Sequence, residues 1–234
     1  MKPILIVQNC EIESAGTILD YLRERQLPHS LVYSFADQEL PDPTNISAAI
    51  VMGCPESVYN FRDYPHLTKL YAFVAAAARQ NLSYLGICGG AQMLAKVLGA
   101  EVKPNPIKEI GTYRLSLTEG GKKDPLFAGF DNAFDVFQWH GDTFKVPFGA
   151  DLLVEGTDCR NQAFRKGNLV GLQFHLEAPL EEASVWCDRN AHELVEVGRT
   201  REQVLAGYQP FADTAKRLNF RLLDNFFQEV LPRP

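Results

Sequence analysis

A cysteine stands between an apolar strand pattern and a helical pattern, and this junction constrains the fold more than any other stretch of the chain. The apolar run 82–87 predicts a strand, and helical spacing begins at once after it, from residue 91. Cys88 lies at the turn, with glycines at positions 86, 89 and 90. A turn this sharp strains its central residue, so the neighbours must lack β-carbons that would collide. It also sets the sulfur at a helix N-terminus, where free N–H groups favour thiolate over thiol.

The stretch Gly86-Ile87-Cys88-Gly89-Gly90 has the form of a nucleophile elbow with cysteine in place of serine. A buried cysteine in a glycine-rich turn would explain the same residues without any chemistry. The choice between the two depends on whether a base with a suitable partner occurs elsewhere in the chain.

A candidate base lies near residue 175, where the run 169–177 reads as a strand that ends in His175-Leu176-Glu177. Side chains two apart on a strand share a face, so His175 and Glu177 can point into one site. A carboxylate beside an imidazole fixes its tautomer and stabilises the imidazolium, which is the third role in a triad. We expect Pro179 to end the strand and to place the pair at the carboxyl edge of the sheet, where sites lie in open α/β sheets.

Two other interpretations of His175 and Glu177 remain open, namely a structural histidine near a strand end and a metal-binding pair. A metal would need a third ligand, and the remaining histidines show no ligand spacing. These are His29, His66, His140 and His192.

Strand and helix patterns alternate over the first hundred residues, which predicts a doubly wound, mostly parallel α/β sheet with helices on both faces. From about 102 to 171 short strands and Gly/Asp turns predict antiparallel additions at one end of the sheet. No repeat or second-domain boundary is visible, so we expect one domain over 1–234. The expected strands are 3–8, 30–35, 48–52 and 82–87, the expected helices are 14–25 and 67–79, and the expected additions are 113–117, 134–137, 152–155 and 162–165.

Composition excludes several classes of protein. The net charge of −6 gives no support to binding of nucleic acid or anionic membranes. No apolar run approaches a membrane span, and the N-terminus is too short for a signal peptide. Five scattered cysteines without a CxxC pattern indicate reduced thiols, so we expect a cytoplasmic protein.

The cysteine elbow and the His-x-Glu pair, about ninety residues apart, resemble the class I (triad) glutamine amidotransferase family. Gln138-Trp139-His140-Gly141-Asp142 resembles a segment of the amidotransferase domains of GMP synthases and their stand-alone relatives. The resemblance covers roughly 3–180, and 222–227 looks like the family's closing helix, expected over about 210–231. It implies a flavodoxin-like fold and a triad of Cys88, His175 and Glu177, with no cofactor and no metal.

The resemblance also implies an oxyanion hole, formed by the backbone N–H of Gly89 and by the loop after the strand 48–52. The family commonly has Gly-Gly-Pro in that loop, whereas this chain has Gly53-Cys54-Pro55. The β-carbon of Cys54 makes a positive φ costly, so we expect Gly53 to supply the bend. A thiol at Cys54 also allows the hypothesis of reversible oxidation with Cys88.

Substrate contacts implied by the resemblance involve Gln92 and the segment His140, Gly141 and Asp142. Gln92 either lines the glutamine pocket or satisfies its own helix backbone. The other three would pass over the γ-glutamyl group, with the Asp142 carboxylate on the α-amino end. For Trp139 we expect packing rather than contact.

About fifty-five residues follow Pro179, more than one closing helix requires. The run 180–197 has helical spacing, and Thr200-Arg201-Glu202-Gln203 is a capping box that opens a short helix. The extra segment, roughly 181–208, is either surface padding, a cover over the active-site edge or a docking surface. Its position directly after Glu177 favours the cover.

The implied reaction is acyl transfer from a γ-glutamyl amide through a glutamyl thioester on Cys88, with His175 as acid and then base. One function is a glutaminase that gives ammonia to a separate synthetase partner, since the chain shows no P-loop pattern. The other is a self-sufficient hydrolase or transferase of γ-glutamyl peptides. A regulatory module without catalysis is disfavoured because all three triad positions are filled.

Overall fold

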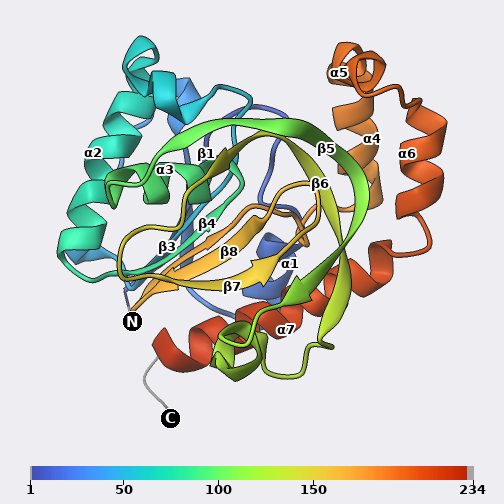
Figure 1. Ribbon diagram of the computed structural model, residues 1–234. Helices are drawn as coiled ribbons and strands as arrows, with labels where there is room; N and C mark the ends of the chain where they lie inside the picture. Colours follow the sequence, from blue (N-terminus) through green and yellow to red (C-terminus); the bar gives the residue numbers. More distant parts are fainter. Residues whose placement is uncertain (1, 231–234) are drawn as a thin grey trace.

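The computed structural model describes residues 2–230, which form a nine-stranded mixed sheet with helices on both faces (Figure 1). The strand order is β2-β1-β3-β4-β9-β8-β7-β5-β6. The first five in this order run parallel, and each of the last four pairs antiparallel with its neighbours. The predicted parallel sheet with antiparallel additions at one end is confirmed. The strands are β1 (Ile4–Gln8), β2 (His29–Tyr33), β3 (Ala48–Val51), β4 (Ser83–Ile87), β5 (Val102–Leu117), β6 (Ala133–Phe144), β7 (Asp151–Glu155), β8 (Asn161–Lys166) and β9 (Leu169–Leu172).

Helices cover the sheet because its parallel strands are apolar on both sides. In β1, Ile4 and Ile6 face a core that includes α1 and α7, while Leu5 and Val7 face a second core with α2 and α3. The helices are α1 (Gly16–Glu24), α2 (Pro65–Arg79), α3 (Gly89–Val97), α4 (Leu180–Arg189), α5 (Ala191–Glu196), α6 (Arg201–Tyr208) and α7 (Ala212–Val230). Short 3₁₀ helices occupy Ser34–Ala36, Pro43–Asn45, Val58–Asp63, Gly121–Lys123 and Pro125–Phe127.

The antiparallel strands are longer than the sequence predicts. β5 and β6 pair with each other along most of their length, with a register shift between Pro104 and Glu109. The prolines at 104 and 106 make this strand hard to recognise from the sequence, since proline has no N–H to donate to a neighbouring strand. The extended pairing matters for the site because it brings Glu109 opposite His140.

Two predicted element boundaries are wrong. β9 ends at Leu172, so residues 173–177 follow the strand rather than belong to it, and His175 forms an isolated bridge with Phe137. Pro179 therefore does not end a strand but precedes the first turn of α4. The expected helix 180–197 is divided at Asn190 into α4 and α5, and residue 231 of the expected closing helix lies outside the described residues.

The extra segment forms α4, α5 and α6, which lie beside the long curved pair β5–β6 (Figure 1). The predicted capping box is present, because the side chains of Thr200 and Gln203 each bond the other's backbone N–H. Tyr208 closes the segment by donating its hydroxyl to the carbonyl of Ala178 at 2.7 Å. Among residues 2–230, no helix combines the length and apolar character that a membrane crossing requires.

Candidate functional site

The turn at Cys88 has the strained geometry that its sequence predicts. Cys88 adopts φ +50° and ψ −111°, a conformation unfavourable for a residue with a β-carbon, and α3 begins at the next residue. A β-carbon at Gly90 would collide with the carbonyl oxygen of Val51, so this close approach of α3 to β3 requires glycine. The side chain of Cys88 is thereby held at the carboxyl edge of the sheet.

The neighbouring strand brings the histidine segment to Cys88. In the parallel pair β4–β9, Ile87 lies opposite Leu172, and the N–H of Cys88 donates to the carbonyl of Leu172 at 2.7 Å. Beyond Leu172 the chain runs past Cys88, and the Gln173 amide nitrogen lies 3.6 Å from the Cys88 Sγ. Backbone hydrogen bonds in both directions between His175 and Phe137 then fix the position of the imidazole.

His175 and Glu177 form a buried pair. The distance from His175 Nδ1 to Glu177 Oε1 is 2.6 Å, and the other carboxylate oxygen accepts the N–H of Leu176. Trp186 of α4 packs edge-on against the imidazole, with the ring centres 4.8 Å apart. The sequence thus placed these two side chains together correctly, although they follow the strand rather than lie on it.

The imidazole of His175 is poised to hold a proton. Burial alone would lower its pKa, but the Glu177 carboxylate and the contact with Cys88 outweigh burial and raise the pKa well above its usual value. Nε2 is buried without a hydrogen-bond partner. This nitrogen is the one left over for proton transfer once Nδ1 is bonded to Glu177.

Burial dominates the pKa of Cys88 and raises it, whereas His175 and the N–H of Gly89 lower it. The helix N-terminus therefore does not by itself make Cys88 a thiolate, contrary to the expectation from sequence. The thiol needs a base, and the adjacent imidazole can be that base.

The two predicted oxyanion loops converge beside Cys88. A β-carbon on Gly89 would lie 3.0 Å from the backbone nitrogen of Cys54. Neither Gly53 nor Cys54 has a positive φ, so the bend expected at Gly53 is wrong and the loop tolerates Cys54 without strain. Burial raises the pKa of the Cys54 thiol well above its usual value, and both Cys54 and Cys88 are free thiols.

A cavity of about 260 Å³ opens at Cys88, and every predicted substrate-contact residue lines it. Its volume suits a ligand smaller than a drug-sized molecule. Gln92 neither satisfies its own helix nor points to solvent, because its amide donates to the carbonyl of Asp142 and to Gln173. The lining consists of Glu13, Cys54, Pro55, Glu56, Ser57, Cys88, Gln92, Lys108, Trp139, His140, Gly141, Asp142, Asn190 and Glu193.

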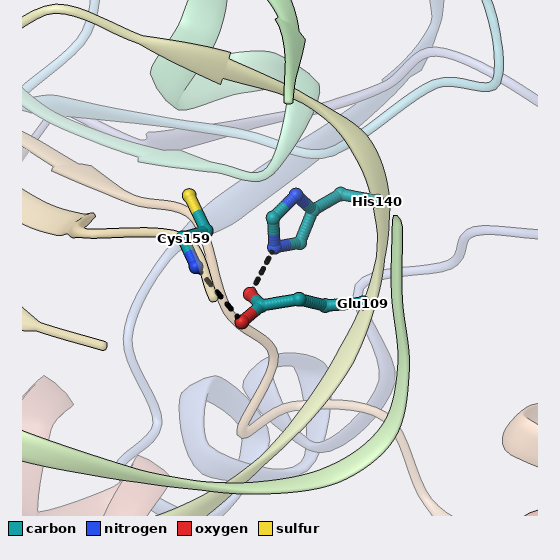
Figure 2. A group of neighbouring side chains, drawn as sticks. All are labelled: Glu109, His140 and Cys159. Atoms are coloured by element: carbon teal, nitrogen blue, oxygen red, sulfur yellow. Dashed lines mark hydrogen bonds and ion pairs between the residues drawn. The ribbon is translucent and has the colours of Figure 1, made fainter. Parts of the chain in front are cut away.

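The His140 side chain points into the protein and contacts Glu109 (Figure 2). Its Nδ1 lies 2.9 Å from the carbonyl oxygen of Asp142, and its Nε2 lies 2.8 Å from Glu109 Oε2. Both ring nitrogens of His140 therefore face oxygen acceptors inside the protein. This buried pair fixes the turn that presents Gly141 and Asp142 to the cavity.

Glu109, His140 and Cys159 are also the group within residues 2–230 whose ligand atoms could hold a metal, since these atoms lie within 4.8 Å of one another. Each already has a partner. Glu109 accepts from His140, from the Cys159 N–H and from Gln162, and the Cys159 Sγ lies 3.1 Å from the Thr143 hydroxyl. Hydrogen bonding therefore accounts for the whole cluster without an ion.

Sequence patterns did not predict several residues that line the cavity. Glu13 follows β1 at the carboxyl edge of the sheet, and this position was the available signal. Lys108, Asn190 and Glu193 carried no local signal, because distant pairing brings them to the cavity. Trp139 does more than pack, since its indole N–H donates to Glu193 at 2.8 Å.

The chain is similar in sequence to several known proteins. The family model described as glutamine amidotransferase class-I matches residues 6–190. The glutamine amidotransferase-like protein YfeJ of Salmonella typhimurium is 31% identical over 189 residues, which is 79% of each chain. The GMP synthase (glutamine-hydrolyzing) of Thermomicrobium roseum is 36% identical over 55% of this chain, but the match spans only 23% of that enzyme.

Solved structures agree with the fold. A glutamine amidotransferase from Thermotoga maritima has a TM-score of 0.87 at 30% identity and covers 96% of this chain and 97% of its own. A glutamine amido transferase from Methylobacillus flagellatus has a TM-score of 0.89 at 24% identity, covering 100% of this chain and 97% of its own. The second comparison bears on the fold alone.

Proposed function

Because the chain belongs to the class I glutamine amidotransferase family, we propose that it hydrolyses a γ-glutamyl amide through a thioester on Cys88. The observation that carries this proposal is the strained Cys88 beside an imidazole whose far nitrogen is bonded to a buried carboxylate at 2.6 Å. This arrangement supports the roles of nucleophile, base and orienting group that covalent acyl transfer requires.

In the proposed first step, His175 Nε2 takes the proton of the Cys88 thiol and the sulfur attacks the γ-carbonyl carbon. The backbone N–H groups of Gly89 and Cys54 stabilise the negative charge that develops on the carbonyl oxygen. His175 returns the proton to the departing amine, so a C–S bond replaces the C–N bond.

In the second step, His175 removes a proton from water, the resulting hydroxide displaces the Cys88 sulfur, glutamate is released and His175 returns the proton to the sulfur. Glu177 keeps the imidazole in one tautomer and stabilises its charged form throughout. Gln92, His140, Gly141 and Asp142 bind the γ-glutamyl group, with the Asp142 carboxylate toward the α-ammonium.

The chain's own extra helices favour a self-sufficient enzyme over an ammonia donor that needs a partner. Asn190 and Glu193, from the loop before α5 and from α5 itself, line the cavity, which supports a role of the segment 181–208 as a cover. A wall that is already in place favours a site that needs no synthetase to complete it.

The test is to incubate the purified protein with glutamine, glutathione and simple γ-glutamyl dipeptides and to measure glutamate and ammonia. Release of glutamate from at least one of them by the protein alone supports the self-sufficient hydrolase. Activity on glutamine that appears only after addition of a cell extract would favour the ammonia donor. No activity under either condition would contradict both.

A further inference from the structure

Two glutamates that no step of the proposed reaction uses line the cavity beside Cys88. Glu13 follows β1 and Glu56 follows β3, so both stand at the same edge of the sheet as the nucleophile. The Oε2 atom of each is buried and has no hydrogen-bond partner. A buried, unpartnered carboxylate oxygen is costly, so its retention in a cavity points to a ligand.

Glu13 lies next to the nucleophile. A β-carbon added to Gly53 would collide with Glu13 Oε2 and would lie 3.3 Å from the β-carbon of Cys88. Burial raises the pKa of Glu13 to about 7, with His175 opposing the rise and the carboxylates of Glu177 and Glu56 adding to it. Glu13 therefore lies near enough to His175 for their charges to interact, and His175 is the residue that the proposed mechanism uses to protonate the leaving amine.

The charges of the cavity do not balance. Its described lining holds four carboxyl groups, from Glu13, Glu56, Asp142 and Glu193, and one cation, Lys108. The Lys108 Nζ lies 2.7 Å from Glu196, outside the lining, and 3.7 Å from Glu193. Lys108 is therefore already neutralised and leaves the other acids uncompensated.

The remaining acids divide by their hydrogen bonds. Asp142 accepts from the Ser57 hydroxyl at 2.6 Å, and Glu193 accepts from the Trp139 indole. Among the described lining residues, Glu13 and Glu56 are the two acids that have a buried carboxylate oxygen without a hydrogen-bond partner. A positive group placed between them would gain two attractive interactions in a partly desolvated site.

We propose that Glu13 and Glu56 bind a cation on the amine half of the substrate, so that the preferred substrates are γ-glutamyl amides of diamines. This rests on the proposed function and names its substrate class. The step balances as a simple hydrolysis, in which the amide and water give glutamate and the diamine, with the leaving nitrogen taking its proton from His175. Neither glutamate bonds to a reacting atom, so both are specificity residues.

The experiment compares three γ-glutamyl amides of similar length that differ in the charge of the amine part. These are the 2-aminoethyl amide (cationic), the propyl amide (neutral) and γ-glutamylglycine, the amide of glycine (anionic). We expect the cationic amide to exceed the neutral one by about tenfold or more in kcat/KM, which is a difference of about 1.4 kcal/mol. The anionic glycine amide should be the poorest. In Glu13→Gln and Glu56→Gln the ratio of kcat/KM for the 2-aminoethyl amide to that for the propyl amide should fall toward one.

Glu119→Gln is the matched control, because Glu119 is an exposed surface glutamate paired with Lys122. It should keep the cationic preference. Equal kcat/KM for the cationic and neutral amides, with glutamine or the neutral amide still hydrolysed, would overturn this inference and leave the proposed function intact. A loss of activity on all three amides in Glu13→Gln would assign Glu13 to the γ-glutamyl group instead, which also overturns it.

If no amide and no glutamine is hydrolysed, the proposed function fails, and a binding measurement still decides the charge preference. Calorimetry on Cys88→Ala should then show a lower Kd for the 2-aminoethyl amide than for the propyl amide. Equal Kd values would overturn the inference independently of any turnover.

Discussion

The indole nitrogen of Trp139 donates to Glu193 Oε2 at 2.8 Å, and this bond ties β6 of the sheet to α5 of the extra segment. Lys108, on β5, adds a second link, since its Nζ also approaches Glu193 and Glu196. Three elements distant in the sequence thus close one side of the cavity. A wall that is bonded in place before substrate arrives lowers the ordering cost of binding.

Glu193→Ala should therefore weaken substrate binding while leaving the nucleophile unaffected. Loss of one hydrogen bond of about 1 kcal/mol predicts a KM increase of roughly fivefold, with kcat changed by less than about twofold. Steady-state kinetics with the best γ-glutamyl amide measure this split. Glu181→Ala, at an exposed position of α4, is the control and should match the wild type. A large fall in kcat with unchanged KM in Glu193→Ala would contradict the assignment of a wall.

The triad residues should differ in cost when each is removed. His175→Ala takes away both the acid and the base, whereas Glu177→Gln leaves an imidazole that is poorly oriented. We expect the loss of kcat in His175→Ala to exceed that in Glu177→Gln by at least about tenfold. The opposite order in kcat would show that Glu177 binds substrate or acts as the base itself.

The buried pair of Glu109 and His140 should contribute strongly to stability. Glu109→Ala leaves His140 Nε2, the Cys159 N–H and the Gln162 amide buried without this acceptor, so it should lower the free energy of unfolding by about 3 kcal/mol or more. Glu109→Gln keeps a hydrogen-bonding group of the same shape and should cost less. Urea unfolding followed by fluorescence gives both values.

A chelator provides the matching control for that cluster, because its hydrogen bonds are complete without a metal. Treatment with EDTA should leave the urea midpoint of the wild type unchanged. A chelator-dependent fall in the midpoint, or a cost below about 1 kcal/mol for Glu109→Ala, would contradict the account of a cluster closed by hydrogen bonds.

The sequence predicted the parts of the site that depend on local spacing. Cys88 could be recognised because glycines and a strand-to-helix change surround it, and His175 and Glu177 because they are two residues apart. Glu109 could not be predicted as a partner of His140, since the β5–β6 register decides that contact. The length of β9 was also missed, because an apolar run does not show where a strand leaves its sheet.

The raised pKa of Glu13 predicts a specific dependence of stability on pH. Its pKa of about 7 in the fold lies above the ordinary value of 4.5, so the folded state holds this proton more tightly than the unfolded state. Stability should fall as pH rises between these two values, because the unfolded chain then ionises Glu13 freely while the folded protein still keeps the proton. The charged and titratable groups around it are His175, Glu177, Glu56 and Cys10.

Glu13→Gln removes that buried charge and should raise Tm at pH 8 by about 5 °C, with little effect near pH 4.5. Thermal melts at the two pH values measure the difference, and Glu119→Gln should melt like the wild type at both. A Tm gain of the same size at both pH values would show that Glu13 does not titrate as described. The stability gained would accompany the loss of cation preference, as in other sites that trade stability for function.

The central claim is a covalent γ-glutamyl intermediate on Cys88, and acid quenching during turnover followed by peptide mass analysis tests it most directly. The peptide that contains Cys88 should carry the mass of one γ-glutamyl group bound through a hydroxylamine-labile thioester. Peptides with Cys10, Cys54, Cys159 or Cys187 should remain unmodified, and Cys88→Ala should show neither adduct nor glutamate release. Glutamate release that persists in Cys88→Ala, or an adduct on a different residue, would contradict the mechanism.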